Sequence, residues 1–371
     1  MNAPVAARKL AILHTEASRG WGGQEIRILT EAAGMIARGH RVLLACPGDA
    51  RIFREATRFR VPAVELPLGR KRLGAVFELR RWLSTQQFDV INSHSSTDTW
   101  LVALARLMLR KAPPLVRTRH ISAAVPKNLA SSWLYRHATS RVVTTGEALR
   151  AQLVRDNGLD PNRVISVPTG IDPGHFQPGD RLLARKLLNL PADAELIGIV
   201  ATLRSWKGHR FLFDALKRSD RPNARLVVVG DGPQRSPLFR LAADLDILER
   251  VVFAGNQNDV APWLRALDVF ALPSYANEGV PQALLQAMMS GLPCVTTAAG
   301  AIGEIAQNEL TALVVPMQDA GALAAALSRL LDDESLRRRL GETARQTVLT
   351  RHSLEAMLDR MEVVFSLAAR G

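Results

Sequence analysis

The sequence contains little cysteine and no long apolar run. Its two cysteines, Cys46 and Cys294, lie far apart in the chain, which excludes a disulfide framework and a cysteine pair with metal-ligand spacing. We expect both to be free thiols in a reducing compartment. No stretch reaches the roughly 18 uninterrupted apolar residues that a membrane-spanning helix needs. The first apolar run, Leu10–Leu13, is also too short for a secretion signal, so we expect a cytoplasmic protein.

Motifs for bound metals and for covalent catalysis are missing as well. No Asp-x-Asp pair stands at the end of an expected strand, and no group of His and Cys residues has the spacing of metal ligands. No Ser-His-Asp pattern is recognisable. The sequence therefore predicts neither a metal nor a cofactor.

Acidic residues are scarce relative to basic ones in one half of the chain only. The net charge of the 371 residues is +13, and the whole excess lies in residues 1–172. The uneven distribution favours an anionic partner, such as a membrane surface or a phosphorylated acceptor, over a solvated basic surface. Nucleic acid is disfavoured because Tyr and Phe, which would stack on bases, are sparse in this half. The densest basic segment contains Arg51, Arg54, Arg58, Arg60, Arg70, Lys71, Arg72, Arg80 and Arg81.

Short apolar segments alternate with helical ones, a pattern typical of parallel β-α units. We expect strands at 9–14, 42–45, 90–92, 115–118, 142–145 and 164–167. Residues 168–176 (PTGIDPGHF) are rich in Pro and Gly and indicate a linker. The alternation then resumes, with strands expected at 196–200, 226–229, 251–253 and 269–272. The sequence therefore predicts two α/β domains with parallel sheets.

The most informative stretch is residues 273–295, PSYANEGVPQALLQAMMSGLPCV. A turn with Glu278 and a Gly-x-Pro step, from Gly279 to Pro281, leads into an apolar helix. Gly291 and Pro293 end that helix, and a further strand follows. Glu278 is thus expected in a loop between a strand and a helix, beside free N–H groups that favour a phosphate. Such loops are where open α/β sheets bind ligands.

This stretch resembles the donor-site signature of the family 4 glycosyltransferases, which have the GT-B fold. The resemblance covers nearly the whole chain, strongly over 196–316 and loosely over 1–170. It implies an α/β structure of two Rossmann-like domains that face a central cleft. Residues 1–170 would bind the acceptor and residues 171–353 the nucleotide-sugar donor. The C-terminal helix, 354–371, would pack back on the first domain.

The resemblance also assigns the residues that act on the reacting groups. Lys207 and Arg204, which follow the strand at 196–200, would neutralise the leaving diphosphate. The family usually has its arginine five residues before the lysine, where this chain has Thr202, and we expect Arg204 to take that role. Glu278 would accept hydrogen bonds from the donor sugar, and His120, at the end of a strand, would lie at the same sugar.

Further residues are assigned to binding on the same basis. His94, in the loop after the strand at 90–92, is expected to face the acceptor. Gln286 stands where the family has a second glutamate that binds ribose, and its amide would form weaker, neutral hydrogen bonds. The residues expected to bind the donor are Gly22, Gly23, Gly230, Gly279, Val280, Gln286 and Gly255.

The function that follows is a retaining, metal-independent transfer of a sugar from a nucleotide-diphosphate sugar. The acceptor would be a saccharide or a lipid-linked molecule of the bacterial cell envelope, such as a lipopolysaccharide core. The basic first half, with Trp82 and Trp133 at the headgroup level, would hold the enzyme on the anionic cytoplasmic face of the inner membrane. Two alternatives remain open. One is a sugar-nucleotide epimerase, which would need acids that we do not identify; the other is a non-catalytic nucleotide-sugar-binding protein, in keeping with Gln286.

Overall fold

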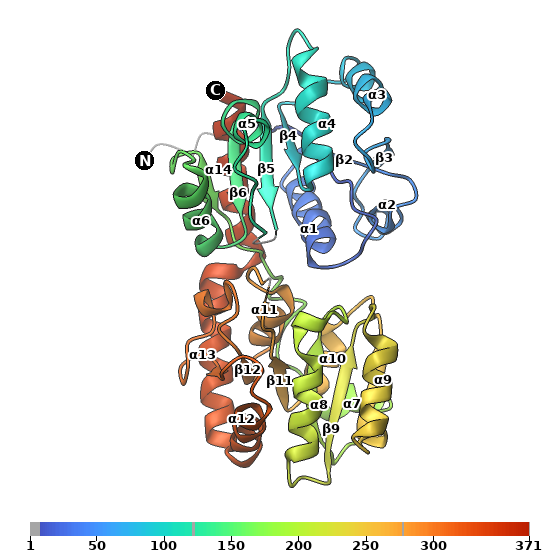
Figure 1. Ribbon diagram of the computed structural model, residues 1–371, viewed down its shortest axis with the longest axis vertical. Coiled ribbons are helices and arrows are strands. Elements are labelled where there is room, and N and C mark those ends of the chain that lie inside the picture. The colour runs from blue at the N-terminus through green and yellow to red at the C-terminus, as the bar shows by residue number, and fades with distance from the viewer. Residues whose placement is uncertain (1–7, 121–122, 277, 371) are drawn as a thin grey trace. The chain divides into compact units, whose positions relative to one another are not determined.

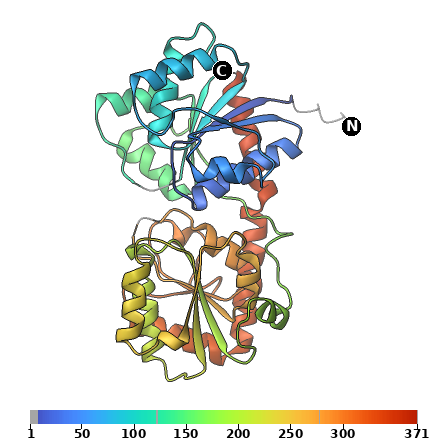
Figure 2. The same cartoon turned by 90° about the vertical axis from the view of Figure 1, so that its right-hand side faces the viewer.

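The structure is a computed structural model that describes residues 8–120, 123–276 and 278–370. The chain divides into two compact units. Met1–Pro168 and Met357–Gly371 form unit 1, and Thr169–Ala356 form unit 2 (Figure 1). Each unit contains one sheet of parallel strands, seven in unit 1 and six in unit 2, and helices lie on both sides of each sheet (Figure 2). The predicted α/β class with parallel sheets is therefore confirmed.

The sheet of unit 1 has the strand order β3-β2-β1-β4-β5-β6-β7. Its strands are β1 (Ala11–Thr15), β2 (Arg41–Cys46), β3 (Ala63–Glu65), β4 (Val90–Ser93), β5 (Leu115–Arg119), β6 (Arg141–Thr144) and β7 (Val164–Ser166). Its helices are α1 (Gly23–Ala37), α2 (Arg51–Ala56), α3 (Leu73–Leu83), α4 (Ser96–Leu107), α5 (Leu129–Trp133), the π-helical turn η1 (Leu134–Ala138), α6 (Glu147–Asn157) and most of α14 (Leu354–Arg370).

Helix α14 is joined to unit 1 by ion pairs and by close packing on α1. The Arg38 guanidinium lies 2.7 Å from Asp359 and 2.8 Å from Glu362. A Cβ atom at Gly34 would lie 2.5 Å from a methyl carbon of Leu358, so the absent side chain lets the two helices approach. The end of the chain is thus part of the same compact unit as its beginning.

The sheet of unit 2 has the order β10-β9-β8-β11-β12-β13. Its strands are β8 (Glu195–Val200), β9 (Ala224–Val229), β10 (Val251–Gly255), β11 (Val269–Leu272), β12 (Cys294–Thr296) and β13 (Leu313–Val314). Its helices are α7 (Arg181–Leu187), η2 (Ser205–Lys207), α8 (His209–Arg218), α9 (Arg235–Asp244), η3 (Leu248–Arg250), α10 (Ala261–Ala266), α11 (Gln282–Met289), η4 (Ile302–Glu304), α12 (Ala320–Asp332) and α13 (Glu334–His352).

Apolar strands and one apolar helix form the core of unit 2. All four residues of β11 are buried, and so is α11 from Leu284 to Met289. Both cysteines, Cys46 and Cys294, are buried free thiols, as predicted. Over the described residues, every helix is too short or too polar to span a bilayer.

Each sheet contains one point at which the strand order reverses direction. In unit 1 this point lies between β1 and β4, and in unit 2 it lies between β8 and β11. Helices on either side of such a point leave the sheet in opposite directions, and the gap beyond the carboxyl ends of the two strands is where open α/β sheets bind ligands. The chain segments that follow these four strands are therefore the expected ligand-binding segments.

Two glycines allow the loops after β8 and β11 to approach each other and a neighbouring loop. Gly208, at φ +77°, could not carry a Cβ atom, which would lie 2.0 Å from the carbonyl oxygen of Pro273. Gly300 has φ +57°, and a Cβ atom there would lie 2.1 Å from the carbonyl oxygen of Glu278. A left-handed backbone and backbone contacts this close leave room for glycine only.

The contact at Gly208 leads to a test of how the loops of unit 2 are held. Gly208→Ala should lower the Tm by about 4 °C or more, because strain of about 2 kcal/mol is expected at a positive φ, and 1 kcal/mol shifts the Tm of a unit of this size by about 2 °C. Differential scanning calorimetry measures this shift. Gly303→Ala is the matched control, since a Cβ atom there meets nothing within 4 Å. Equal Tm values for the two variants would contradict the close approach.

Candidate active site

A buried ion pair joins the two loops at the reversal point of unit 2. The ammonium nitrogen of Lys207 donates a hydrogen bond of 2.7 Å to Oε1 of Glu278. The Glu278 side chain is 6 % exposed and that of Lys207 is 19 % exposed. Lys207 ends η2 after β8, and Glu278 follows β11, so the two residues, 71 positions apart in the chain, meet at the carboxyl edge of adjacent strands.

Backbone hydrogen bonds lock the loops that present this pair. The N–H of Tyr275 donates to the carbonyl of Trp206 at 2.9 Å, which ties the β11 loop to the β8 loop. The N–H of Leu203 donates to the carbonyl of Asp231 at 3.0 Å, which ties the β8 loop to the β9 loop. The N–H of Ala301 donates to the carbonyl of Glu278 at 3.2 Å. The position of Glu278 is therefore fixed by its main chain as well as by Lys207.

The other groups expected at the diphosphate lie in these same loops. Arg204 is exposed, and its guanidinium carbon lies 5.6 Å from the centre of the Trp206 ring. In the part of the chain that the structure describes, the N–H groups of Gly279 and Val280 donate no backbone hydrogen bond. These two donors and two cationic side chains at one edge of the sheet can neutralise an anionic group.

The remaining residues expected at the donor lie at the same edge or next to it. Gly230 directly follows β9, and its N–H donates to the carbonyl of Gly255, the last residue of β10, at 2.8 Å. Gly230 has φ +138°, and a Cβ atom there would lie 2.0 Å from the carbonyl oxygen of Ala201. Gln286 lies on α11 and is buried. The structure thus brings Lys207, Glu278, Gly230 and Gly255 together on adjacent strand ends.

In unit 1 the glycine-rich loop after β1 is organised by a buried acid that the sequence did not single out. Oε1 of Glu16 accepts hydrogen bonds from the N–H groups of Ala17 and Ser18, each at 2.7 Å. Gln24 donates to Oε2 of Glu16 at 2.5 Å. Gly22 caps α1 with an extended backbone and Gly23 is its first residue. Glu16 therefore fixes the entry into α1 and the two glycines with it.

Three histidines form a hydrogen-bonded column at the reversal point of unit 1. Nδ1 of His14 lies 2.9 Å from Nε2 of His94, and Nδ1 of His94 lies 3.0 Å from Nε2 of His120. His14 and His94 are buried and His120 is half-buried. His14 belongs to β1, His94 follows β4, and His120 follows β5. The structure therefore brings His94 and His120 together and adds His14, which the sequence analysis placed only within a buried strand.

Burial keeps this column uncharged at neutral pH. It lowers the pKa of His14 to about 3. Burial also lowers the pKa of His94 and of His120 well below the usual value, and the positive charges of Arg27 and Arg117 act in the same direction on both. A neutral imidazole has one N–H and one bare nitrogen. The column can therefore hold substrate hydroxyls by hydrogen bonding but not an anion by charge.

One buried acid, Asp98, supports the column from the side. Asp98 accepts hydrogen bonds from the N–H groups of His94, at 3.0 Å, and Ser95, at 2.8 Å, and from the hydroxyl of Thr15, at 2.7 Å. Burial, with the charge of Glu16, raises the pKa of Asp98 to about 7 despite these bonds and the charge of Arg117. Asp98 is the third residue of α4 and forms a capping box with the N-cap residue Ser95, and its bond to the N–H of His94 fixes the backbone there.

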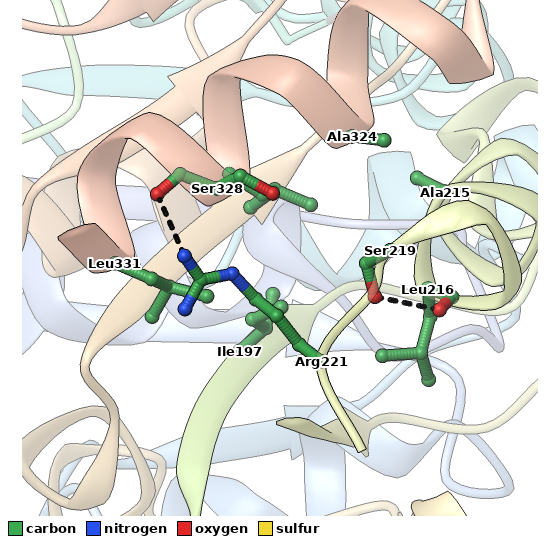
Figure 3. A pocket seen from close by; sticks show the side chains of 9 residues that line it. Ile197, Ala215, Leu216, Ser219, Arg221, Ala324, Ser328 and Leu331 are labelled. Atoms are coloured by element: carbon green, nitrogen blue, oxygen red, sulfur yellow. Dashed lines mark hydrogen bonds between the residues drawn. The ribbon is translucent and has the colours of Figure 1, made fainter. Parts of the chain in front are cut away.

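Two other kinds of site are relevant in the described residues, a metal centre and a small cavity. Within the described ranges, no three or more His, Cys, Asp or Glu residues are arranged to hold a metal ion. A small cavity between α8 and α12 measures about 10 Å³, room for one water at most (Figure 3). There Arg221 donates to the carbonyl of Ser328, and the hydroxyl of Ser219 to that of Leu216. This cavity belongs to the packing of unit 2.

Two family models match the chain, one over each unit. The model described as "Glycosyltransferase Family 4" matches residues 21–175, and the model described as "Glycosyl transferases group 1" matches residues 180–347. The second match contains Arg204, Lys207, Glu278 and Gln286.

Characterised relatives are glycosyltransferases. A UDP-Gal:alpha-D-GlcNAc-diphosphoundecaprenol alpha-1,3-galactosyltransferase of Escherichia coli is 27% identical over 283 residues, which is 72% of each chain. A D-inositol 3-phosphate glycosyltransferase of Mycobacterium tuberculosis is 31% identical over 266 residues, 66% of this chain and 54% of the relative. The chain thus spans about half the length of the mycobacterial relative that it matches.

Solved structures of similar fold cover almost the entire chain. A glycosyltransferase from Rickettsia africae has a TM-score of 0.86 at 18% identity and covers 98% of this chain and 99% of its own. HepE of Anabaena, solved in complex with UDP-glucose, has a TM-score of 0.86 at 20% identity and covers 96% and 99%. WaaG, a glycosyltransferase involved in lipopolysaccharide biosynthesis, has a TM-score of 0.72 at 19% identity and covers 96% and 99%. The chain is therefore a glycosyltransferase of the GT-B fold that belongs to the group 1, family 4 glycosyl transferases.

Proposed function

We propose that the protein transfers a sugar from a nucleotide-diphosphate sugar to a lipid-linked or saccharide acceptor of the bacterial cell envelope, with retention of the anomeric configuration. The observation that carries the proposal is the buried Lys207–Glu278 pair at the reversal point of unit 2. The Escherichia coli relative supports the donor and acceptor classes, because its name specifies UDP-galactose and a diphosphoundecaprenol-linked sugar. The relatives favour neither an epimerase nor a non-catalytic binding protein.

The chemistry requires that the bond between the anomeric carbon and the diphosphate oxygen breaks, with the electron pair leaving on the diphosphate. An acceptor hydroxyl then bonds to the same face of that carbon and gives up its proton to an oxygen of the departing diphosphate. Lys207 and Arg204 would stabilise the charge that develops on the diphosphate, together with the N–H groups of Gly279 and Val280. Glu278 would hold the donor sugar by accepting hydrogen bonds from its hydroxyls.

The other assigned residues would position the substrates. Gln286 would bind the ribose through neutral hydrogen bonds, and Gly230 and Gly255 would let the backbone approach the nucleotide. In unit 1, Gly22 and Gly23 would let the loop before α1 approach the donor phosphate. His120 would bind a sugar hydroxyl, and His94, which lies in the same column, would face the acceptor side.

The ion pair is tested by removing either partner. Lys207→Ala and Glu278→Ala should each lower kcat/KM by about 100-fold or more, the typical effect of losing one preorganised charged contact. Transfer is measured with UDP-sugars as first donors, by release of UDP. Circular dichroism and Tm show whether each variant folds. If Glu278→Ala is destabilised because Lys207 loses its partner, Glu278→Gln replaces it in the assay.

The matched control is an exposed ion pair in the same unit. Arg329 and Glu309 lie on the surface with side chains 52 % and 44 % exposed. Arg329→Ala should leave kcat/KM within about twofold, since exposed pairs contribute little. Near-normal turnover by a folded Lys207→Ala or Glu278→Ala protein would contradict the assignment of the site.

Transfer is proposed to be independent of metal, since cationic side chains and N–H groups neutralise the diphosphate. Activity should persist in a large excess of chelator, assayed after dialysis of the protein against the same chelator. Addition of Mg²⁺ or Mn²⁺ should change kcat by less than about twofold, because no step relies on a Lewis acid. Complete loss of activity in chelator with recovery on adding metal would refute this part of the proposal.

The proposed membrane partner fits a surface formed by α3 and α4, which pack side by side in unit 1 (Figure 1). Apolar side chains project from this α3–α4 surface: Leu73 (76 % exposed), Phe77 (60 %), Leu104 (37 %), Leu107 (67 %) and Met108 (38 %). The same two helices and the segments next to them carry exposed basic residues, namely Arg70, Lys71, Arg72, Arg80, Arg81, Arg110 and Lys111. Nε of Arg80 lies 3.4 Å from the carbonyl oxygen of Met108, which places one of these charges beside the apolar group.

Trp82 and Trp133, predicted to lie at the headgroup level, are half-buried. Trp82 packs against Phe88, with ring centres 5.9 Å apart, and Trp133 stacks on Trp100 at 5.9 Å. Because part of each ring is covered, we assign most of the apolar contact to the α3–α4 surface. The basic residues would then bind the anionic cytoplasmic face of the inner membrane.

Vesicle sedimentation tests this surface. Binding should appear with anionic lipid, weaken steeply with salt, and fall at least tenfold in Arg80→Glu/Arg81→Glu, since each basic residue near an anionic surface contributes about 1 kcal/mol. Leu73→Ser/Phe77→Ser should weaken binding even at high salt, because buried apolar area does not depend on ionic strength.

The controls for this experiment make the same changes in unit 2. Lys217→Glu/Arg218→Glu alters the net charge equally, and Leu182→Ser/Leu187→Ser replaces two leucines that are 59 % and 70 % exposed. Both controls should bind vesicles like the unmodified protein. Equal sedimentation with neutral and anionic vesicles would exclude the membrane partner and leave the transferase assignment intact.

A further inference from the structure

Two arginines of β5 are buried without a carboxylate partner. Arg117 and Arg119 are 6 % and 8 % exposed and lie two positions apart in the strand, so both side chains leave the same face of the sheet. Among the residues that the structure describes, neither forms an ion pair, and Nη1 of Arg117 and Nε of Arg119 have no hydrogen-bond partner. An unpaired charge in a protein interior is costly, and buried cations normally have an anion beside them.

Asp98, whose pKa is affected by the charge of Arg117, already accepts hydrogen bonds from other groups. Asp98 responds to the charge of Arg117, but its two oxygens accept three hydrogen bonds from Thr15, His94 and Ser95. Asp98 is therefore engaged in the capping box at the start of α4, and the guanidinium groups keep N–H donors without a partner.

Tyr135, on η1, connects the arginines with an open groove. Its hydroxyl accepts a hydrogen bond of 2.7 Å from Nη1 of Arg119. Burial raises the pKa of Tyr135, but the charges of Arg117 and Arg119 and their hydrogen bonds outweigh burial, and the pKa is lowered. The two guanidinium charges thus favour the ionised form of this hydroxyl. His120, beyond the end of β5, is subject to the same two charges.

The groove that Tyr135 lines has a volume of about 870 Å³, in the range of sites for small molecules. Lys127 and Arg136 line it together with apolar Val125 and Leu129, and Leu129 is 91 % exposed. The acid among its lining residues, Asp156, already pairs with Arg155 at 2.8 Å. The groove therefore offers positive charge and apolar surface side by side.

From these contacts we infer that unit 1 contains a phosphate-binding site formed by Arg117, Arg119 and Tyr135, at the inner end of the groove that Lys127 lines. Its ligand is a phosphate or diphosphate group of the acceptor. The assignment of this group to the acceptor rests on the proposed function. Arginine suits this ligand because its fork donates two parallel hydrogen bonds to phosphate oxygens. The tyrosine hydroxyl, which accepts from Arg119, can donate its own proton to a third oxygen.

The site is tested by binding, without turnover. The full chain is titrated by calorimetry with inorganic phosphate and with pyrophosphate at constant ionic strength. Arg117→Gln and Arg119→Gln should each weaken binding at the unit 1 site by about tenfold or more, the size of one charge-assisted hydrogen bond, and Tyr135→Phe should weaken it less. Arg106→Gln is the matched control, because Arg106 is a half-buried arginine of the same unit whose N–H groups donate to the carbonyls of Pro113 and Ala138.

A second variant separates the two units. Lys207→Ala removes anion binding in unit 2 and should leave the Arg117-dependent binding unchanged. If pyrophosphate binding is lost in Lys207→Ala and unaffected in folded Arg117→Gln, Arg119→Gln and Tyr135→Phe proteins, the inference is wrong. This outcome does not touch the proposed function, which the UDP-release assay addresses separately.

The source of the phosphate is distinguished with one further ligand. Geranyl diphosphate carries the same diphosphate on a short isoprenoid chain. Binding tighter than that of pyrophosphate, reduced by Leu129→Ser, indicates a lipid-linked phosphate held partly by the apolar lining. Equal affinity of the two ligands, with the same loss in Arg119→Gln, indicates a soluble phosphorylated acceptor.

Discussion

The parallel pairing of every strand is the constraint on which the rest of this structure depends. Parallel strands all end at the same edge of a sheet, and each crossover must return along a helix before the next strand can start. Side chains far apart in the chain are thereby delivered to one edge. Lys207 and Glu278 meet in this way, and so do His14, His94 and His120. Both groups lie where the strand order reverses, which makes their positions a property of topology before any ligand is considered.

The cationic side chains at the two sites differ in whether they are paired with an acid. In unit 2 the cation Lys207 has its counter-charge, Glu278, within 2.7 Å, so the site is electrostatically balanced when empty. In unit 1 Arg117 and Arg119 lack such a partner within the described residues. A balanced pair must exchange its internal contact for contacts with a substrate, whereas Nη1 of Arg117 and Nε of Arg119, which have no hydrogen-bond partner in the described chain, can gain one without breaking another. The second arrangement favours strong binding of an anion, and the first favours selectivity for a ligand that offers both hydroxyls and phosphate.

The sequence predicted the α/β class, the parallel strands and the loops of unit 2, because these depend on local apolar patterns and on turn residues. Glu278 and Lys207 could be proposed from a family pattern, but their contact could not, since no periodicity links residues 71 positions apart. His14 was missed because a polar residue at the end of an apolar strand looks like a strand terminus. The burial of Arg117 and Arg119 could not be predicted from the sequence, because burial of an arginine is decided by neighbouring strands. The aromatic contacts of Trp82 and Trp133 could not be predicted either, because their partners come from other segments of unit 1.

The histidine column also limits which hydrogen bonds unit 1 can form with a substrate. Each neutral ring has a single N–H, so the three rings share only two possible directions of donation, inward or outward. Reversing that direction moves protons along the column and moves no heavy atom. His120 then changes from a hydrogen-bond donor to an acceptor while its ring stays in place. Nε2 of His14, which lies buried against Phe365 and has no hydrogen-bond partner in the described chain, sets the cost of each direction. The innermost ring, out of reach of any substrate, therefore helps to decide which kind of hydroxyl contact the outermost ring can make.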